Sequence, residues 1–457
     1  MASIKDINGS LETGFVTLER VGFDVPLIIG RTGQRSVLEH GSGTSGIRIK
    51  SVVRDAVYNI IVEVTGPVYS YALVTDTITI TVPTTNTAKA LVAAYSSAPA
   101  EVQAAITIAA LTTGSGAVAA LATTAMAKTA IYQQIVDKSQ IEHYYDITDP
   151  EYIIINNMLG GSGTHVTNLY LLDTYGVPSY DLAATLTTYN DGKWWAGCLA
   201  NIDSTEALAI ADWFSNEKRF LFLVTDDVNE LSSIQGRLAY IIHPASQKVE
   251  HPEASWMAKG LVPAPGSSDW AGISDLQGQT PDETTSLTGL LAIRTANGNA
   301  YIKQSGNSFT QDGRANQVGA SDSAPQYIAD FMFQDWLLLN METDLLALKL
   351  AKIKQGSKLN YDESGIREVV ATLANRLRLG ADNGGIAVVS NKDQASQSYD
   401  GEYRYNVSAP TRAQVEADSP GDIVLQILKD VTFWYVKSGT IQKITFSGLE
   451  LLTEPAA

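Results

Sequence analysis

The chain has 457 residues, of which 45% are hydrophobic and 18% charged, so it is a folded protein of roughly two to four domains. Its 49 acidic and 32 basic residues give a net charge of −17, which argues against wrapping of a nucleic acid or binding to an anionic membrane. The single cysteine, Cys198, excludes an intramolecular disulfide. Without a secretory signal or an apolar run of about 18 residues, we expect a soluble protein made in a cytoplasm.

The first fifty residues divide into two parts. Residues 1–20 are mostly polar and predict an extended arm. Residues 21–50 contain a short apolar run at 25–29 and a turn-rich connector, GSGTSG, at 41–46. The connector matches the spacing of a dinucleotide-binding loop, but the strand-like segment after it favours a plain loop, because that site needs a following helix.

Residues 51–140 carry few charges and predict a small inserted α+β unit. Strands are expected at 58–64 and at 77–82, where threonine alternates with apolar residues. An alanine-rich helix is expected at 88–96. The unit is therefore expected to lie outside the main body.

Residues 141–269 alternate between strand-like and helical segments. Strands are predicted at 152–155, 219–225 and 238–243, and helices begin at Asp203 or Ser204 and at residue 228. This alternation predicts an α/β layer with a partly parallel sheet.

The C-terminal part begins with a long helix at 324–355, with Ser323 as its cap and Pro325 in its first turn. A second helix at 362–378 is expected to stop at Gly380, and strands are expected at 422–437 and 440–446. We expect arms at both ends of the chain, at 1–20 and 438–457, to pair with a neighbour's sheet edge. The residues assigned to this pairing are Ile4, Ile7, Phe15, Val16, Ile441, Ile444 and Phe446.

The search for catalytic and metal-binding motifs finds none. The five histidines do not stand at zinc-binding spacing, no calcium loop occurs, and the glycines at 160–163 lack the pattern of a nucleophile elbow. Trp194 and Trp195 could stack on a sugar, although a core position is favoured. The many carboxylates are best explained as a solvated acidic surface, with a glycosidase pair among them as the alternative. We therefore expect no catalytic residue, no metal and no cofactor.

Lysines cluster at the end of the long helix, in an otherwise acidic chain. One interpretation is a solvated helix face whose lysines pair with Glu342 and Asp344; the other is a surface that docks on an acidic protein. Both remain open at this point. The cluster consists of Lys349, Lys352, Lys354 and Lys358.

Several segments together resemble the contractile tail sheath proteins of bacteriophages and related injection systems. They are WMAKG at 256–260, PGS at 265–267 with Trp270, GNAY at 298–301, QYIADFMFQDW at 326–336, YDESGI at 361–366 and the ending at 423–446. The low-charge unit at 51–140 is similar to a domain near the start of many sheath proteins.

The resemblance implies a multidomain α/β (α+β) protein that is structural and not an enzyme. It places a core sheath domain at 21–50 and 270–457, an outer domain at 51–140 and a middle domain at 141–269. It also implies stacked hexameric rings, linked by exchanged arms, that contract around an inner tube and drive it through the bacterial envelope. The tube would face Lys349 and Lys352.

The implied partners are copies of the chain, the tail tube protein, and baseplate and tail terminator proteins, with no nucleic acid and no membrane insertion. The implied location is the virion, after assembly in the host bacterial cytoplasm. Two alternatives remain: a glycan-binding or depolymerase protein of the virion, using the β-rich unit and Trp194–Trp195, and a non-contractile tube protein.

Overall fold

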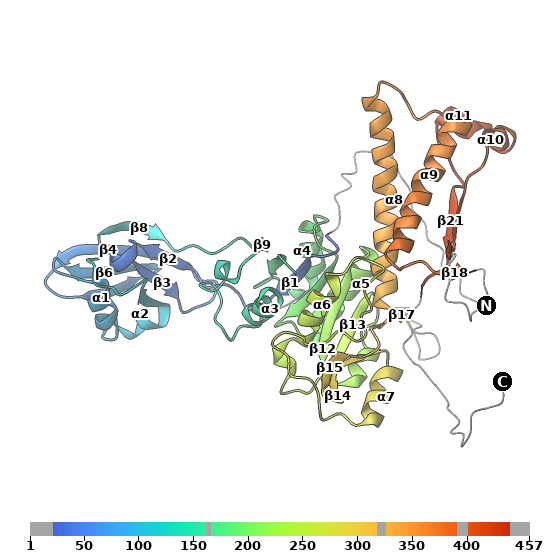
Figure 1. Ribbon diagram of the computed structural model, residues 1–457. Helices are drawn as coiled ribbons and strands as arrows, with labels where there is room; N and C mark the ends of the chain where they lie inside the picture. The colour runs from blue at the N-terminus through green and yellow to red at the C-terminus, as the bar shows by residue number, and fades with distance from the viewer. Residues whose placement is uncertain (1–21, 161–165, 318–325, 391–400, 439–457) are drawn as a thin grey trace, which may run out of the picture.

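The computed structural model describes residues 22–160, 166–317, 326–390 and 401–438. These residues form three units: an outer unit on one side, a central α/β unit, and a helical unit that rises from the central one (Figure 1).

The central unit is built on one eight-stranded sheet. Its inner strands run parallel to one another in the order β10-β1-β11-β12-β13-β14. The edge strands pair antiparallel, β9 with β10 and β15 with β14. The sheet combines strands from all three predicted domain ranges: β1, β14 and β15 come from 21–50 and 270–457, β10 to β13 come from 141–269, and β9 comes from 51–140. The strands are β1 (Pro26–Gly30), β9 (Tyr132–Ile135), β10 (Leu169–Asp173), β11 (Ala196–Ala200), β12 (Phe220–Thr225), β13 (Leu238–Ile242), β14 (Asn299–Gln304) and β15 (Asn307–Thr310).

Helices cover both faces of this sheet, which explains why its inner strands are apolar throughout. In β1, Ile28 faces a core with α3 (Pro150–Leu159), α6 (Pro252–Leu261) and the start of α8 (Ile328–Lys354). Its neighbours Leu27 and Ile29 face the opposite core, which contains α4 (Leu182–Thr188), α5 (Ser204–Asn216) and α7 (Leu287–Thr295). The partly parallel α/β layer expected from the sequence is confirmed.

The outer unit has an apolar core of its own. A three-stranded sheet is formed by β2 (Val37–His40), β3 (Ile47–Ser51) and β7 (Ile106–Ala110), and the connector at 41–46 lies between β2 and β3, so it is a loop as predicted. The predicted strands at 58–64 and 77–82 and helix at 88–96 are confirmed. The remaining elements are β4 (Asn59–Gly66), β5 (Ser70–Val74), β6 (Thr77–Pro83), β8 (Leu121–Ala125), α1 (Ala88–Tyr95) and α2 (Ala100–Ala105).

The helical unit is a pair of long helices with a strand ribbon beside them (Figure 1). A short pairing of β16 (Arg314–Ala315) with β17 (Gln326–Tyr327) leads into α8 (Ile328–Lys354), and α9 (Glu363–Asp382) packs against it. Both predicted helices are confirmed. The chain then forms β18 (Val388–Ser390), β19 (Gly401–Tyr403), β20 (Tyr405–Ser408), α10 (Arg412–Asp418), α11 (Pro420–Leu425) and β21 (Thr432–Tyr435).

Three predicted elements were wrong. The apolar run at 152–155 is not a strand but part of α3, which begins at Pro150. The prediction failed because a short apolar run has the same composition in a buried helix as in a buried strand. The helix expected at 228–237 is a 3₁₀ segment that ends at Ser232. The strand expected at 422–437 is divided between α11 and the four residues of β21.

The end of α9 also differs from the prediction. The helix continues through Gly380 to Asp382. Gly380 therefore does not end the helix; it allows a close contact with α8. A β-carbon at Gly380 would lie 2.9 Å from the ring of Phe333 on α8, so glycine lets the two helices approach. The predicted start of the long helix at Ser323 and Pro325 lies outside the described residues.

Candidate functional site

The described residues bear on the candidate sites that the sequence left open. Among them, no group of three or more histidine, cysteine, aspartate or glutamate side chains could hold a metal ion. Trp194 and Trp195 are buried, with 0% and 1% of their surface exposed, so the core interpretation is confirmed and neither ring is available to a sugar. A search of the described helices for a span long and apolar enough to cross a bilayer finds none.

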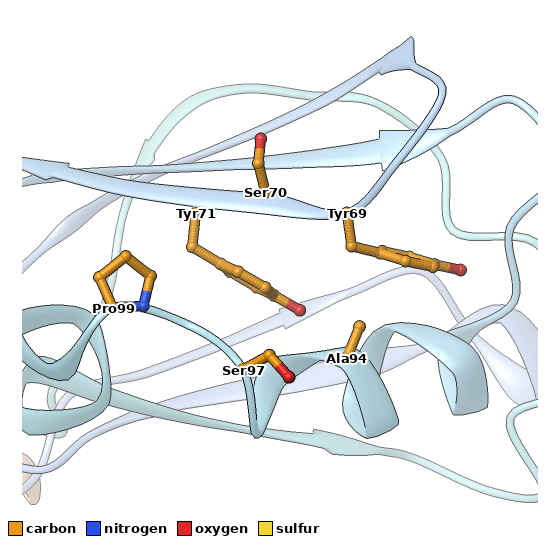
Figure 2. A pocket seen from close by; sticks show the side chains of 6 residues that line it. All are labelled: Tyr69, Ser70, Tyr71, Ala94, Ser97 and Pro99. Atoms are coloured by element: carbon orange, nitrogen blue, oxygen red, sulfur yellow. The ribbon is translucent and has the colours of Figure 1, made fainter.

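An open depression of about 430 Å³ lies on the outer unit between the edge strand β5 and α1. Tyr71 in β5 and Tyr69 just before it point toward the helix that carries Ala94, whereas Ser70 points to the other side (Figure 2). The hydroxyl of Tyr71 donates to the carbonyl of Leu91 at 3.0 Å. No acidic or basic side chain lines the depression, so it has no acid–base pair for hydrolysis.

The base of α8 is anchored in the central unit by a buried polar contact. The indole Nε1 of Trp195 donates to Oδ2 of Asp335 at 2.8 Å, and Arg237 donates to the same oxygen. Arg237 also lies over the ring of Phe331, 4.9 Å from its centroid, and this ring packs against Phe220. Because one carboxylate joins α8 to two segments of the sheet, α8 leaves the central unit in a fixed direction.

Farther along α8, ion pairs and apolar contacts hold α9 beside it. Arg376 on α9 donates two hydrogen bonds of 2.8 Å to the carboxylate of Asp344, and its guanidinium lies over Trp336. Lys352 makes an ion pair of 2.7 Å with Glu368. Asp344 is therefore the partner of an arginine on α9 and not of a lysine in the cluster, which the single-helix interpretation did not foresee.

The two lysines that were expected to face a tube have different surroundings in the structure. Lys352 is engaged with Glu368, whereas Lys349 is partly exposed and has no ion-pair partner within the described part of the chain. Lys354 and Lys358 are exposed. An antiparallel helix hairpin brings Lys352 opposite Glu368, so the predicted pair of helices held the signal for this contact.

Apolar side chains are exposed at the same end of the helical unit. Leu350 and Ile353 on α8 have 46% and 57% of their surface exposed, and Val424 on α11 has 82%. This end lies away from the central sheet (Figure 1). Lysines beside exposed apolar groups make it a candidate protein-binding surface.

The ribbon of β20 and β21 is a second candidate surface. Val407, Phe433 and Tyr435 pack on the core between the long helices, while Trp434 is 55% exposed. The two strands pair antiparallel and form a sheet of only two strands among the residues that the structure describes. Such a ribbon presents backbone groups that can pair with an added strand.

After β21 the chain continues toward its C-terminal end, and Lys437 forms an isolated antiparallel β-bridge with Ile386. The residues predicted to exchange between subunits lie outside the described ranges, so their pairing stays a prediction. They are Ile4, Ile7, Phe15, Val16, Ile441, Ile444 and Phe446.

Comparison with known proteins adds a likeness of fold. No protein-family model matches the sequence, and no curated protein does. A chain in the cryo-EM structure of the anti-feeding prophage baseplate is similar with a TM-score of 0.50 and 12% identity, over 70% of this chain and 88% of that one. This likeness confirms, as far as the fold is concerned, the resemblance seen in the sequence.

Two crystal structures of sheath tail proteins are also similar, at lower scores. The protein from Listeria innocua has a TM-score of 0.42 and 8% identity, over 92% of this chain and 95% of that one. The protein from Desulfitobacterium hafniense has a TM-score of 0.38 and 10% identity, over 89% and 93%.

Proposed function

We propose that this protein is a structural subunit of a contractile tail sheath. The fold that it shares with a chain of the anti-feeding prophage baseplate is the observation that carries the proposal. Copies of the chain stack as hexameric rings in a helix around an inner tube, and contraction drives the tube through the bacterial envelope. The protein then resides in the virion after assembly in the bacterial cytoplasm, with baseplate and terminator proteins at the ends of the polymer.

The contacts between subunits are strand exchanges onto the ribbon. Arms from neighbouring subunits, at 1–20 and 438–457, add strands to β20 and β21 and cover exposed groups such as Trp434. Head-to-tail contacts of this kind do not close, so they propagate a filament. A ladder of backbone hydrogen bonds also suits contraction, because the arms can hinge while their paired strands stay together.

The tube lies against the far end of α8. Lys349 and the exposed Lys354 supply positive charge there, and Leu350 supplies apolar contact. Each exposed ion pair with an acidic tube is worth about 0–1 kcal/mol and is screened by salt. Many weak contacts over a ring hold the extended state and still break together when the sheath contracts.

Negative-stain microscopy of the purified full chain tests this function. We expect wide, hollow polymers with helical striations. Monodisperse trimers would contradict the sheath and favour a tail spike, and narrow polymers that enclose no second tube would favour a non-contractile tube protein.

A further inference from the structure

A cluster of charged side chains lies where the outer unit meets the central unit. Asp146 and Asp149 precede α3 in the central unit, whereas Lys50 lies in β3 and Arg54 shortly after it, in the outer unit. Arg35 lies in the segment that connects the two. We call these five residues the charged joint: Arg35, Lys50, Arg54, Asp146 and Asp149.

The two aspartates bind all three cations. Oδ2 of Asp146 accepts from Nε and Nη2 of Arg35 at 2.9 and 2.7 Å, and its Oδ1 accepts from Nζ of Lys50 at 2.7 Å. Nη2 of Arg54 donates to Oδ1 of Asp149 at 2.6 Å. The second oxygen of Asp149 accepts from the backbone N–H of Asp146 at 2.7 Å, so the two carboxylates are held as one acceptor group.

Most of the joint is partly buried. The Asp149 side chain has 8% of its surface exposed and those of Arg35, Lys50 and Arg54 have between 17% and 23%, whereas that of Asp146 has 37%. The aspartates also lie before the first turn of α3, where the helix dipole favours negative charge. A shared, partly buried network of this kind fixes geometry better than isolated exposed pairs do.

Further hydrogen bonds and an ion pair hold the connecting segments beside the charged joint. The N–H of Arg35 donates to the carbonyl of Tyr144 at 2.9 Å, and Arg54 donates to the carbonyl of Gly33 at 3.0 Å. On the second connection, Lys128 forms an ion pair with Asp55. The connections therefore have defined paths and do not act as flexible linkers.

Among the described residues, the two units share no apolar core that could fix their orientation instead. The buried residues of the outer unit form one cluster and those of the central unit form two others. The outer unit projects to one side of the central sheet (Figure 1). Domains joined without a shared core ordinarily move relative to each other.

We propose that the charged joint locks the outer unit to the central unit, so that the two move as one rigid body, and that the lock depends on the carboxylates of Asp146 and Asp149. The outer unit is then a fixed projection of each subunit and follows every rotation of the central unit. This property does not require that the protein form a sheath.

Distances between two spin labels on the full chain, measured by pulsed electron paramagnetic resonance, test the lock. Val74→Cys in the outer unit and Val249→Cys in the central unit place labels at positions that are 70% and 60% exposed. The native Cys198 is buried and does not take up the label. We expect a narrow distance distribution in the parent, and a distribution broadened by about twofold or more in Asp146→Asn/Asp149→Asn, because freed domains reorient.

A matched control removes the same charge elsewhere. Asp212 and Asp418 are exposed, so Asp212→Asn/Asp418→Asn should keep the narrow distribution. If the double aspartate variant of the joint misfolds, Lys50→Gln/Arg54→Gln breaks the same contacts from the outer unit. A broad distribution in the parent, or a narrow one in the folded joint variants, overturns the proposal.

Discussion

Asp335 on α8 accepts a hydrogen bond of 2.8 Å from the indole of Trp195 on the central unit, a contact between residues 140 positions apart. Both partners are buried, and Arg237 completes the group. The direction in which the helical unit leaves the sheet is set here, so everything proposed for the far end of α8 depends on this anchor.

Removing the Asp335 carboxylate should destabilise the protein strongly. Asp335→Ala leaves Arg237 as a buried charge without its partner, which costs about 3–5 kcal/mol in the free energy of unfolding. Trp195→Phe keeps an aromatic ring against Phe220 but removes the Nε1 donor and part of the buried ring, so it should cost about 1–3 kcal/mol. Urea denaturation followed by circular dichroism measures both, and equal losses would contradict the anchoring role of the carboxylate.

The structure changes how the tube contact is tested. Lys352→Glu would face Glu368 and disturb the pairing of α8 with α9, so its effect would mix stability with tube binding. Lys349→Glu alters a side chain without an ion pair in the described ranges. In sheaths assembled with their tube, we expect Lys349→Glu to weaken retention of the tube, and high salt to do the same in the parent.

Lys89→Glu is the control for that experiment, because it reverses an exposed charge on the outer unit. Sedimentation of sheath and tube across a salt series gives the retained fraction. If Lys349→Glu holds its tube as firmly as Lys89→Glu does, the lysines at this end form only a solvated face.

The arms should be needed for polymerisation and not for folding. Deleting residues 438–457 leaves all four core clusters intact, since the buried residues of these clusters lie before that point. We expect a monomer with the parent's circular dichroism spectrum and thermal midpoint that forms no polymer in light scattering. Normal polymers from the truncated chain would contradict strand exchange through the C-terminal arm.

The outer unit should be removable at boundaries that the structure defines. Val37 and Ala127 exchange backbone hydrogen bonds of 2.7 and 2.9 Å, so the ends of the unit are adjacent. Replacing residues 37–127 with a short Gly/Ser linker should leave a soluble chain that still polymerises. A cut at 51 and 140 would remove β9 from the central sheet, and it should aggregate in the same solubility assay.

Acid should weaken the charged joint only well below neutral pH. Burial raises the pKa of Asp146, but the hydrogen bonds from Lys50 and Arg35 outweigh it and leave the pKa below its ordinary value of 3.8. A carboxyl whose pKa is lowered by folding contributes stability above its ordinary pKa and loses it as pH falls through the folded value. The spin-label distribution should therefore stay narrow at pH 5 and broaden only below about pH 4, and broadening near pH 6 would contradict this assignment.

The sequence predicted elements best where one local signal dominated. The threonine alternation before Val82 predicted β6, and the capping residues Asp203 or Ser204 predicted the start of α5, where the structure shows Asp203 as the cap. Residues 152–155 were misassigned because an isoleucine run suits a buried helix and a buried strand equally. The partners of Asp146 could not be predicted, since Arg35 and Lys50 lie about a hundred residues earlier in the chain and meet it only when the two units pack.

Cryo-electron microscopy of the polymer formed by the full chain tests the central claim most directly. We predict a hollow helical assembly of six-fold rings in which the ribbon of β20 and β21 gains strands from neighbouring subunits and the end of α8 with Lys349 lines the inner wall. A polymer whose ribbons remain two-stranded, or whose inner wall is formed by the outer unit, would contradict the account.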